Sequence, residues 1–395
     1  MGYIDKLRDS LSLRGNVPGL VASGFIEGTA WQMHELVWQP YVISLGGSMA
    51  TIGGMRSLWT LVTNGLQFVT GELCDSWGRK TVITGYYLAS IAGLLISVYA
   101  RNWRWLIPVI LLYSIADSLG ETSFYPIFAE SVDAKRIGLS ISLLSLTWFL
   151  PGLYGKLFAG YIGDNIGLVN VLRLVLAGEV AATLVFLFGV DETLKERRPM
   201  DWAAVRRNIV GIIKPRGDLR DVYLLSILDR FSWAINRGIF VAMLYESFGL
   251  SLLQIGVLMT VATATTSLAL IPVGNLVDRH GSPVFLRASV LLAITSFAGY
   301  ALFRSFPVLV VLQVLRGLAM GLWDPSYNSF LAKAVPEGER GSLYGSINGL
   351  RGIIVFPAPI IGAYIFEGFG LRGTFAASIA VSSIALVIAL RLRNR

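Results

Sequence analysis

Ionisable side chains interrupt several long apolar stretches of this chain, and in the first stretch they recur at helical spacing. Side chains three or four residues apart lie on one face of a helix, so one face of 17–44 would collect Glu27, Trp31, His34, Glu35 and Trp38. Burial favours the neutral form of a carboxyl group, and a nearby cation favours its charged form. A buried acid there can therefore bind a proton in one environment and release it in another.

A second apolar stretch carries acids as well. Asp117 and Glu121 lie one helical turn apart in 104–127, and an ordinary imidazole, as in His34, titrates at about pH 6.5. The alternative role for any one acid is a structural ion pair, for example Asp117 with Lys156. The candidates for a proton site are Glu27, His34, Glu35, Asp117 and Glu121.

Later stretches add arginine and aromatic residues that suit a binding cavity. Arginine binds carboxylate and phosphate groups through paired N–H donors, and aromatic faces suit flat, hydrophobic or cationic ligands. The candidates for the cavity wall are Trp31, Trp38, Tyr113, Asp229, Arg230, Trp233, Asn236, Arg237, Arg316, Asp324 and Arg351. Asp324 precedes Pro325, and this pair would either break its helix and expose carbonyl groups or only kink it.

The elements that must position these residues are long apolar helices. Of 395 residues, 54% are hydrophobic and 15% are charged, whereas soluble domains are about 25% charged. Stretches of about 20 apolar residues span a bilayer as α-helices and are too long for the strands of about ten residues in an outer-membrane barrel. The sequence predicts an all-α integral membrane protein with twelve spans, at roughly 17–44, 51–71, 80–100, 104–127, 138–162, 168–190, 221–245, 252–274, 283–303, 306–331, 342–366 and 371–391.

The net charge of +8 is distributed by topology rather than gathered in one patch. With the N-terminus placed in the cytoplasm, most Lys and Arg residues fall on the cytoplasmic side. The outer loops then hold Arg101, Arg104, Arg304 and Arg372. This is the positive-inside pattern, and it puts both termini in the cytoplasm. We therefore expect a multi-pass protein of the cell membrane, in contact with the lipid bilayer, and no binding of nucleic acid.

The chain also contains an internal repeat. A shift of 203 residues pairs Gly46–Ser48 with Gly249–Ser251, Gly71–Gly78 with Gly274–Gly281, and Gly167 with Gly370. A shift of 202 residues pairs Glu27 with Asp229, Trp31 with Trp233, and His34 with Asn236. Because six spans separate the two copies, both have the same orientation in the membrane.

The repeat divides the chain into two bundles and a linker. We predict a six-helix bundle at 1–190, a cytoplasmic linker at 191–220 and a second six-helix bundle at 221–395. The linker carries apolar residues at helical spacing: Trp202, Val205, Ile209 and Ile213. They indicate either a short amphipathic helix on the inner membrane surface or a plain solvated linker.

The segment between the second and third spans reads Gly71-x-Leu73-x-Asp75-x-x-Gly78-Arg79-Lys80-Thr81. It resembles the signature loop of the major facilitator superfamily. A degenerate copy at 274–281 falls where that family repeats the loop, with Ser282 and Pro283 in place of the basic pair. The resemblance implies a conformational latch on the cytoplasmic side, formed by Gly71, Asp75, Gly78, Arg79, Lys80, Gly274, Asp278 and Gly281. A tight turn with positive-inside charges is the alternative.

The same resemblance implies two six-helix bundles, with spans one, four, five, seven, ten and eleven facing a central cavity. Spans three, six, nine and twelve would form an outer scaffold. The charges inside the predicted spans follow this division, because most of them lie on the cavity spans. Arg173 and Glu179 on span six are exceptions.

Two further segments resemble the drug/proton antiporter branch of that superfamily. Trp148–Gly155 in the fifth span is similar to its Gly-Pro-rich motif, without the glycine before the proline and with Lys156 behind it. Arg316–Gly321 in the tenth span is similar to an Arg-Gly motif that the branch carries in span four, where this chain has no arginine. The branch often places a proton-binding acid in span one, so the resemblance implies Glu27 and Glu35 first.

No nucleotide-binding loop, catalytic triad or metal-ligand spacing stands out, so we expect no enzyme activity, no metal and no cofactor. We expect a secondary active transporter that moves a small molecule by alternating access as a functional monomer. Proton-coupled export of amphipathic compounds is the first expectation. Proton-coupled uptake of a polar or anionic solute is the alternative, which Arg230, Arg237, Arg316 and Arg351 favour. A non-transporting membrane sensor is the alternative of another class.

Overall fold

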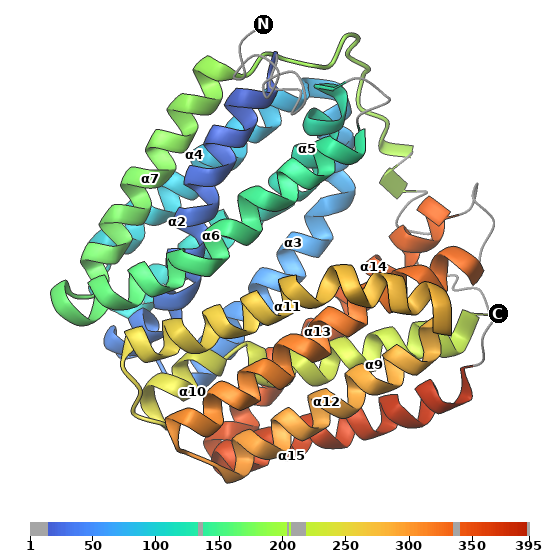
Figure 1. Ribbon diagram of the computed structural model, residues 1–395. Coiled ribbons are helices and arrows are strands. Elements are labelled where there is room, and N and C mark those ends of the chain that lie inside the picture. The colour runs from blue at the N-terminus through green and yellow to red at the C-terminus, as the bar shows by residue number, and fades with distance from the viewer. Residues whose placement is uncertain (1–14, 133–136, 204, 207–218, 335–339, 393–395) are drawn as a thin grey trace, which may run out of the picture. The chain divides into compact units, whose positions relative to one another are not determined.

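The computed structural model describes residues 15–132, 137–203, 205–206, 219–334 and 340–392. Within these ranges the regular elements are helices, and none is a strand (Figure 1). The first half contains α2 (Val17–Ser44), α3 (Met49–Trp77), α4 (Arg79–Tyr99), the short 3-10 helix η1 (Trp103–Trp105), α5 (Leu106–Glu130), α6 (Ile137–Ile166) and α7 (Leu168–Gly189). The second half contains α9 (Arg220–Arg237), α10 (Phe240–Glu246), α11 (Leu252–His280), α12 (Ser282–Leu302), α13 (Phe306–Ala334), α14 (Arg340–Val355) and α15 (Ala358–Arg391).

These helices confirm the predicted all-α membrane fold. Six segments of the described chain are long and apolar enough to cross a bilayer by length and composition alone: Arg79–Tyr99, Leu168–Gly189, Leu252–His280, Ser282–Leu302, Phe306–Lys333 and Ile347–Arg391. In the first half, α2, α3, α5 and α6 have 28, 29, 25 and 30 residues. At a rise of about 1.5 Å per residue, each exceeds a hydrocarbon core of about 30 Å.

The seventh and eleventh spans are bent rather than continuous, which the predicted spans did not anticipate. The seventh divides into α9 and α10 at Gly238, and the eleventh divides into α14 and α15 at 356–357. The two bends lie close together, because a Cβ atom on Gly238 would meet the Pro359 side chain at 2.7 Å. Glycine therefore allows the two spans to cross at short range. By contrast, α13 continues through Pro325, so the helix break considered there does not occur.

The repeat is visible in the backbone. Three pairs of glycines related by the 203-residue shift have a positive φ: 80° and 64° at Gly46 and Gly249, 102° and 86° at Gly78 and Gly281, and 90° and 65° at Gly167 and Gly370. A positive φ strains any residue with a Cβ atom, so glycine is required at such turns. The two halves therefore share the same turns between equivalent helices, as the parallel repeat requires.

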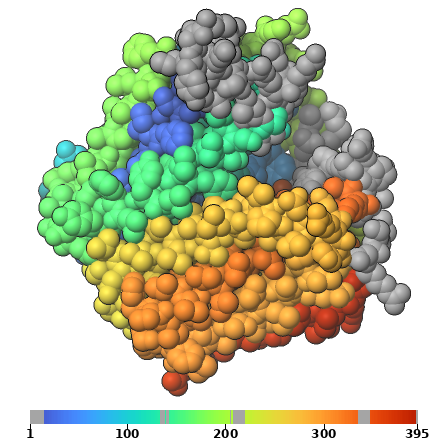
Figure 2. Space-filling model, in the orientation of Figure 1, coloured from blue at the N-terminus to red at the C-terminus, as the bar shows by residue number. Residues whose placement is uncertain are grey.

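The chain packs as two compact units, Met1–Tyr41 with Val62–Asn208, and Val42–Leu61 with Ile209–Arg395. In the second unit, α13 packs between α11 and α12, and this face is closely filled by side chains (Figure 2). Helix α3 contributes to both units, since its first part packs on α15, where the Ile360 N–H group donates to the Ser57 hydroxyl at 3.1 Å. The division into 1–190, 191–220 and 221–395 stays a prediction.

Candidate functional site

A buried acidic cluster lies in the first unit. Glu27 of α2 is 3% exposed, and the hydroxyl group of Tyr86 in α4 donates a hydrogen bond to its Oε1 atom at 2.5 Å. Glu179 of α7 is 5% exposed, and its charge interacts with that of Glu27. Asp117 of α5 also interacts electrostatically with Glu27. Like charges buried together cannot all ionise without a large cost, so the cluster is suited to hold a proton.

Glu179 is the residue of this cluster that sequence reasoning left out of the proton site. The family resemblance put its span in the outer scaffold, whereas α7 turns Glu179 toward Glu27, with the Ser90 hydroxyl as a neighbouring hydrogen-bond donor. A signal was present in the sequence. An ionisable residue in an otherwise apolar span is costly and is by default a functional candidate.

Glu35 shares a face of α2 with Glu27 but has a different environment. The Nζ atom of Lys156 in α6 lies 2.9 Å from its Oε2 atom, and the two side chains are 6% and 30% exposed. This corrects the ion pair considered for Lys156, whose partner is Glu35 rather than Asp117. Glu121 is exposed and accepts a hydrogen bond from the Gln67 side chain of α3. The predicted acids thus occupy three separate surroundings.

The aromatic residues of the first span pack within the first unit. His34 meets the ring of Tyr113 edge-on, with the centroids 5.0 Å apart. The Trp31 ring lies 6.1 Å from that of His34, and Trp38 is buried. These contacts account for the aromatic face as helix packing, and a role for Trp31, Trp38 or Tyr113 in a substrate cavity stays a prediction.

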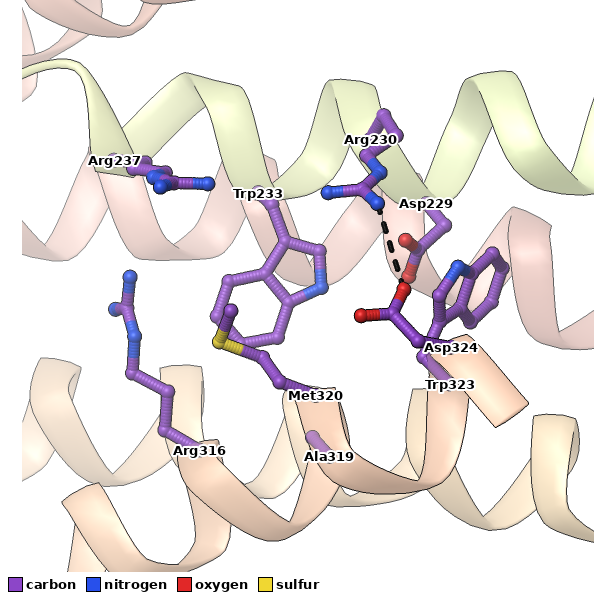
Figure 3. Close-up of a pocket in the computed structure, with 9 residues that line it drawn as sticks. All are labelled: Asp229, Arg230, Trp233, Arg237, Arg316, Ala319, Met320, Trp323 and Asp324. Carbon is purple, nitrogen blue, oxygen red and sulfur yellow. Dashed lines mark ion pairs between the residues drawn. The ribbon is translucent and has the colours of Figure 1, made fainter. Parts of the chain in front are cut away.

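A pocket lies within the second unit, between α9 and α13 (Figure 3). About 440 Å³ of space, part of it open solvent, lies between its walls. Six predicted cavity residues line it, namely Asp229, Arg230, Trp233, Arg237, Arg316 and Asp324, together with Ala319, Met320 and Trp323.

Two arginines occupy one end of this pocket. Arg316 of α13 extends across the space toward Arg237 of α9, whose side chain lies at the same end of the pocket (Figure 3). Arg316 is 8% exposed, and its guanidinium carbon lies 4.9 Å from the ring centre of Trp233 and 4.2 Å from that of Phe240. Contacts with two aromatic rings fix the position of this positive charge.

The carboxylates occupy the other end. Asp229 and Asp324 lie there together, and an Nη2 atom of Arg230 is 3.7 Å from an Oδ1 atom of Asp324 (Figure 3). Asp229 is buried, whereas the side chains of Arg230 and Asp324 are 37% and 55% exposed. Trp233 and Met320 lie between the two ends. The pocket therefore offers cations, an apolar middle and a partly neutralised acidic end.

Two predicted cavity residues of the second unit lie outside this pocket lining. Asn236 is fully buried, and its amide donates to the Ser378 hydroxyl of α15 at 3.1 Å, so it joins two helices instead. Arg351 of α14 acts on the pocket through its charge, which interacts with Asp229, Arg230 and Asp324.

The signature loop of the first half is organised by Arg79. Its Nη1 atom lies 2.5 Å from an Oδ1 atom of Asp75, and its Nη2 atom lies 3.1 Å from an Oε1 atom of Glu130 in α5. The Thr193 hydroxyl donates to the other oxygen of Glu130 at 2.5 Å. One guanidinium thus joins the ends of α3 and α5 through two carboxylates.

The first turn of α4 is capped by Glu192, a residue that the sequence did not single out. The N–H groups of Arg79 and Lys80 donate to its carboxylate at 3.0 and 3.2 Å, where a negative charge is favoured by the helix dipole. Asp75, the acid of the signature loop, pairs with the Arg79 side chain instead of capping this helix. Lys80 donates through Nζ to the Leu187 carbonyl at 2.9 Å.

The second copy of the loop keeps the turn without the basic pair. Gly274 and Asp278 lie within α11, and Gly281 separates α11 from α12 with a φ of 86°. Helix α12 then begins with Ser282 and Pro283. Gly71 likewise lies within α3. A latch role for either copy stays a prediction.

Part of the predicted linker helix can be described. Trp202 is exposed and Val205 is buried, whereas Ile209 and Ile213 lie outside the described residues, as do both chain ends, 1–14 and 393–395. Among the residues that the structure describes, no group of three or more His, Cys, Asp or Glu side chains is arranged to hold a metal ion.

Comparison with known proteins identifies relatives of the whole chain. The model of the Major Facilitator Superfamily matches residues 20–216 and 222–395. The proton-coupled antiporter flippase LtaA of Staphylococcus haemolyticus is 22% identical over 358 residues, which cover 87% of this chain and 84% of the relative. The multidrug resistance protein MdtG of Dickeya zeae is 23% identical over 379 residues, covering 91% of this chain and 90% of the relative.

Solved structures show the same fold at low sequence identity. The nucleoside transporter NupG superposes with a TM-score of 0.80 at 15% identity, covering 95% of this chain and 99% of the other. A bacterial homolog of the human lysosomal transporter Spinster superposes with a TM-score of 0.73 at 13% identity, covering 95% of each chain. At such identities the likeness establishes the fold alone.

Proposed function

Because this chain belongs to the Major Facilitator Superfamily, we propose that it exports amphipathic compounds from the cell by alternating access, driven by protons. Membership makes it a multi-pass membrane transporter of small molecules and not an enzyme. The proposal adds the proton, the direction and the substrate class. It further includes a cell-membrane location with both termini in the cytoplasm, function as a monomer, and no binding of nucleic acid.

The buried Glu27 is the single observation that carries proton coupling. A carboxylate inside a membrane bundle is costly, and Glu27 lies among Tyr86, Glu179 and Asp117 rather than in an ion pair with Lys156, whose partner is Glu35. Protonation removes the buried charge, and access to water on one side restores it. Binding or release of the proton would therefore shift the equilibrium between the two access states.

The relatives support the coupling and the direction of transport. One is a proton-coupled antiporter flippase, and another is a multidrug resistance protein. The pocket of the second unit supports an amphipathic substrate, since Trp233, Met320 and Trp323 offer apolar surface beside charged groups.

Reconstitution into liposomes tests the proposal. The purified protein is inserted into vesicles with an imposed pH gradient, and the flux of a panel of amphipathic dyes, anionic, neutral and cationic, is followed. We expect at least one dye to move up its own concentration gradient, in the direction opposite to proton flow. This movement should stop when an uncoupler collapses the pH gradient. A dye flux that does not depend on the pH gradient would contradict proton coupling. A dye flux in the same direction as the proton flux would contradict export.

A matched pair of variants locates the coupling. Glu27→Gln removes the buried acid, while Glu246→Gln makes the same change at an exposed position at the end of α10. We expect Glu27→Gln to lose gradient-driven flux while retaining downhill exchange of the dye, and Glu246→Gln to behave as wild type. Equal gradient-driven flux in both variants would place the proton site elsewhere.

A further inference from the structure

Resting on the proposed function, we infer that the substrates are amphipathic organic anions, whose carboxylate, sulfonate or phosphate group binds between Arg237 and Arg316. The inference concerns the pocket of the second unit alone. It adds the sign of the substrate's charge and the residues that recognise it.

The first argument is the orientation of the two arginines. Their side chains come from different helices, α9 and α13, and line the same end of the pocket, where Arg316 extends toward Arg237 (Figure 3). Two positive charges at one end of a pocket repel each other. An anion bound between them attracts both and offsets this repulsion. Arginine also presents paired N–H donors that match the oxygens of such an anion.

The second argument is that Arg316 is held in place. It is 8% exposed, and the rings of Trp233 and Phe240 lie at 4.9 and 4.2 Å from its guanidinium carbon. A long side chain ordinarily loses conformational freedom when it binds a ligand, and an arginine already fixed between rings loses less. Arg316 is therefore a preorganised anion-binding group, and Arg237, which is exposed, completes it from the other wall.

The third argument is the balance of charge along the pocket. Its lining has three arginines and two aspartates. Arg230 lies at the acidic end, 3.7 Å from Asp324, so the excess positive charge falls at the end of Arg237 and Arg316. An anionic ligand would meet two cations at the end of Arg237 and Arg316, whereas Arg230 partly neutralises the acidic end that a cationic ligand would need.

The apolar part of the substrate is set by the residues next to this pair. Trp233 and Met320 lie between the arginines and the aspartates (Figure 3). An aromatic ring and a thioether accept flat or flexible apolar groups of many shapes. The site would therefore select by charge at one end and tolerate variety in the rest of the molecule.

Binding of three matched probes to the full-length protein in lipid nanodiscs tests the inference. Naphthalene-2-carboxylate, naphthalene-2-methanol and naphthalene-2-methylammonium share one apolar body and differ in charge. Calorimetric titration, with empty nanodiscs as the blank for lipid partitioning, gives each affinity. We expect the anion to bind at least about tenfold more tightly than the other two, since one hydrogen-bonded charge pair contributes that much or more.

Variants then assign the preference to the two arginines. We expect Arg316→Gln and Arg237→Gln each to weaken binding of the carboxylate by about tenfold or more and to leave the neutral probe unchanged. Arg316→Lys, which keeps the charge and loses the paired donors, should fall between. Arg304→Gln is the matched control, because Arg304 also lies on an aromatic ring, that of Phe248 at 4.5 Å, outside the pocket lining. Gel filtration and thermal melting confirm that each variant is folded.

Equal affinity for the three probes, no binding of any of them, or an unchanged preference in Arg316→Gln and Arg237→Gln would each overturn the inference. These outcomes are separate from those of the flux experiment, because titration requires no gradient. A protein that prefers the anion but moves no dye against a proton gradient contradicts the proposed function alone. One that is driven by protons without preferring anions contradicts only the inference.

Discussion

Glu27 and Asp229 occupy equivalent positions in the first spans of the two halves, and their surroundings differ. Glu27 accepts a hydrogen bond from Tyr86 and interacts with the acids Asp117 and Glu179. Asp229 is buried to a similar degree, yet it borders an open pocket and lies beside Arg230. A duplicated helix has thus kept an acid at the same place and changed its neighbours.

The difference indicates a division of labour. Glu27 lies near Asp117 and Glu179, whereas Asp229 interacts with Arg230 and Arg351 as well as with Asp324, so its charge adds to the field of the binding pocket. The first half would then serve mainly the proton and the second mainly the substrate. The following predictions compare a residue with one in the other half or with its own partner.

The largest effect is expected for Glu27→Gln. The substitution removes the titrating group without changing its size, so gradient-driven transport should fall at least about a hundredfold, to the level of the uncoupled exchange. Asp229→Asn should keep the coupling and alter the apparent affinity for substrate. Flux and affinity are measured on the same vesicles. If Asp229→Asn uncouples transport and Glu27→Gln does not, the two halves have been assigned the wrong way round.

Glu179→Gln sharpens the same comparison within the first half. If Glu27 and Glu179 influence each other's protonation, removing one charge should shift the pH dependence of transport, whereas a purely structural Glu179 should alter stability alone. The measurement is the flux-against-pH profile of the variant beside that of wild type. A profile identical to wild type would leave Glu179 outside the proton site.

The next effect is expected at the signature loop. Arg79→Gln breaks contacts with Asp75 and Glu130, and the loss of hydrogen bonds to charged groups costs about 1.5–3 kcal/mol each where water cannot replace them. The counterpart of Arg79 in the second copy is Ser282, so the control is Arg279→Gln, at an exposed arginine of that copy, which should shift stability by less than about 0.5 kcal/mol. Thermal melting in detergent compares the two. Similar melting temperatures for Arg79→Gln and Arg279→Gln would contradict the organising role of Arg79 in the loop.

Much of this architecture follows from the sequence because membrane spans obey a simple length and polarity rule. The helix that begins at Val17 and ends at Ser44 was predicted at those residues, and the glycine turns were located by the repeat. The bends at Gly238 and before Ala358 were not, since they depend on which helices cross. The partners of individual side chains also could not be predicted from the sequence. Whether Lys156 meets Asp117 or Glu35 depends on the rotation of α6, which apolar sequence patterns leave open.

An intermediate effect on stability is expected for the ion pair between Lys156 and Glu35, and the loss should depend on which partner is replaced. Lys156 is 6% exposed and Glu35 is 30% exposed. Glu35→Gln leaves a buried ammonium group without its partner, whereas Lys156→Gln leaves a carboxylate that water can still reach, so Glu35→Gln should destabilise the protein more. The double variant should recover part of that loss. Melting temperatures of the three variants form the cycle, and a larger loss for Lys156→Gln would contradict the order.

The smallest effect on transport is expected for the third pair of equivalent residues, His34 and Asn236. His34 packs against Tyr113, and Asn236 donates to Ser378 away from the pocket lining. Asn236→Ala should lower stability by about 1 kcal/mol, the net worth of one hydrogen bond, and leave ligand affinity unchanged. His34→Gln should likewise leave the pH profile of transport within about twofold of wild type, because its neighbours fix it as a packed aromatic group. A shifted pH profile in His34→Gln would add the imidazole to the proton site, and weaker ligand binding in Asn236→Ala would extend the pocket toward α15.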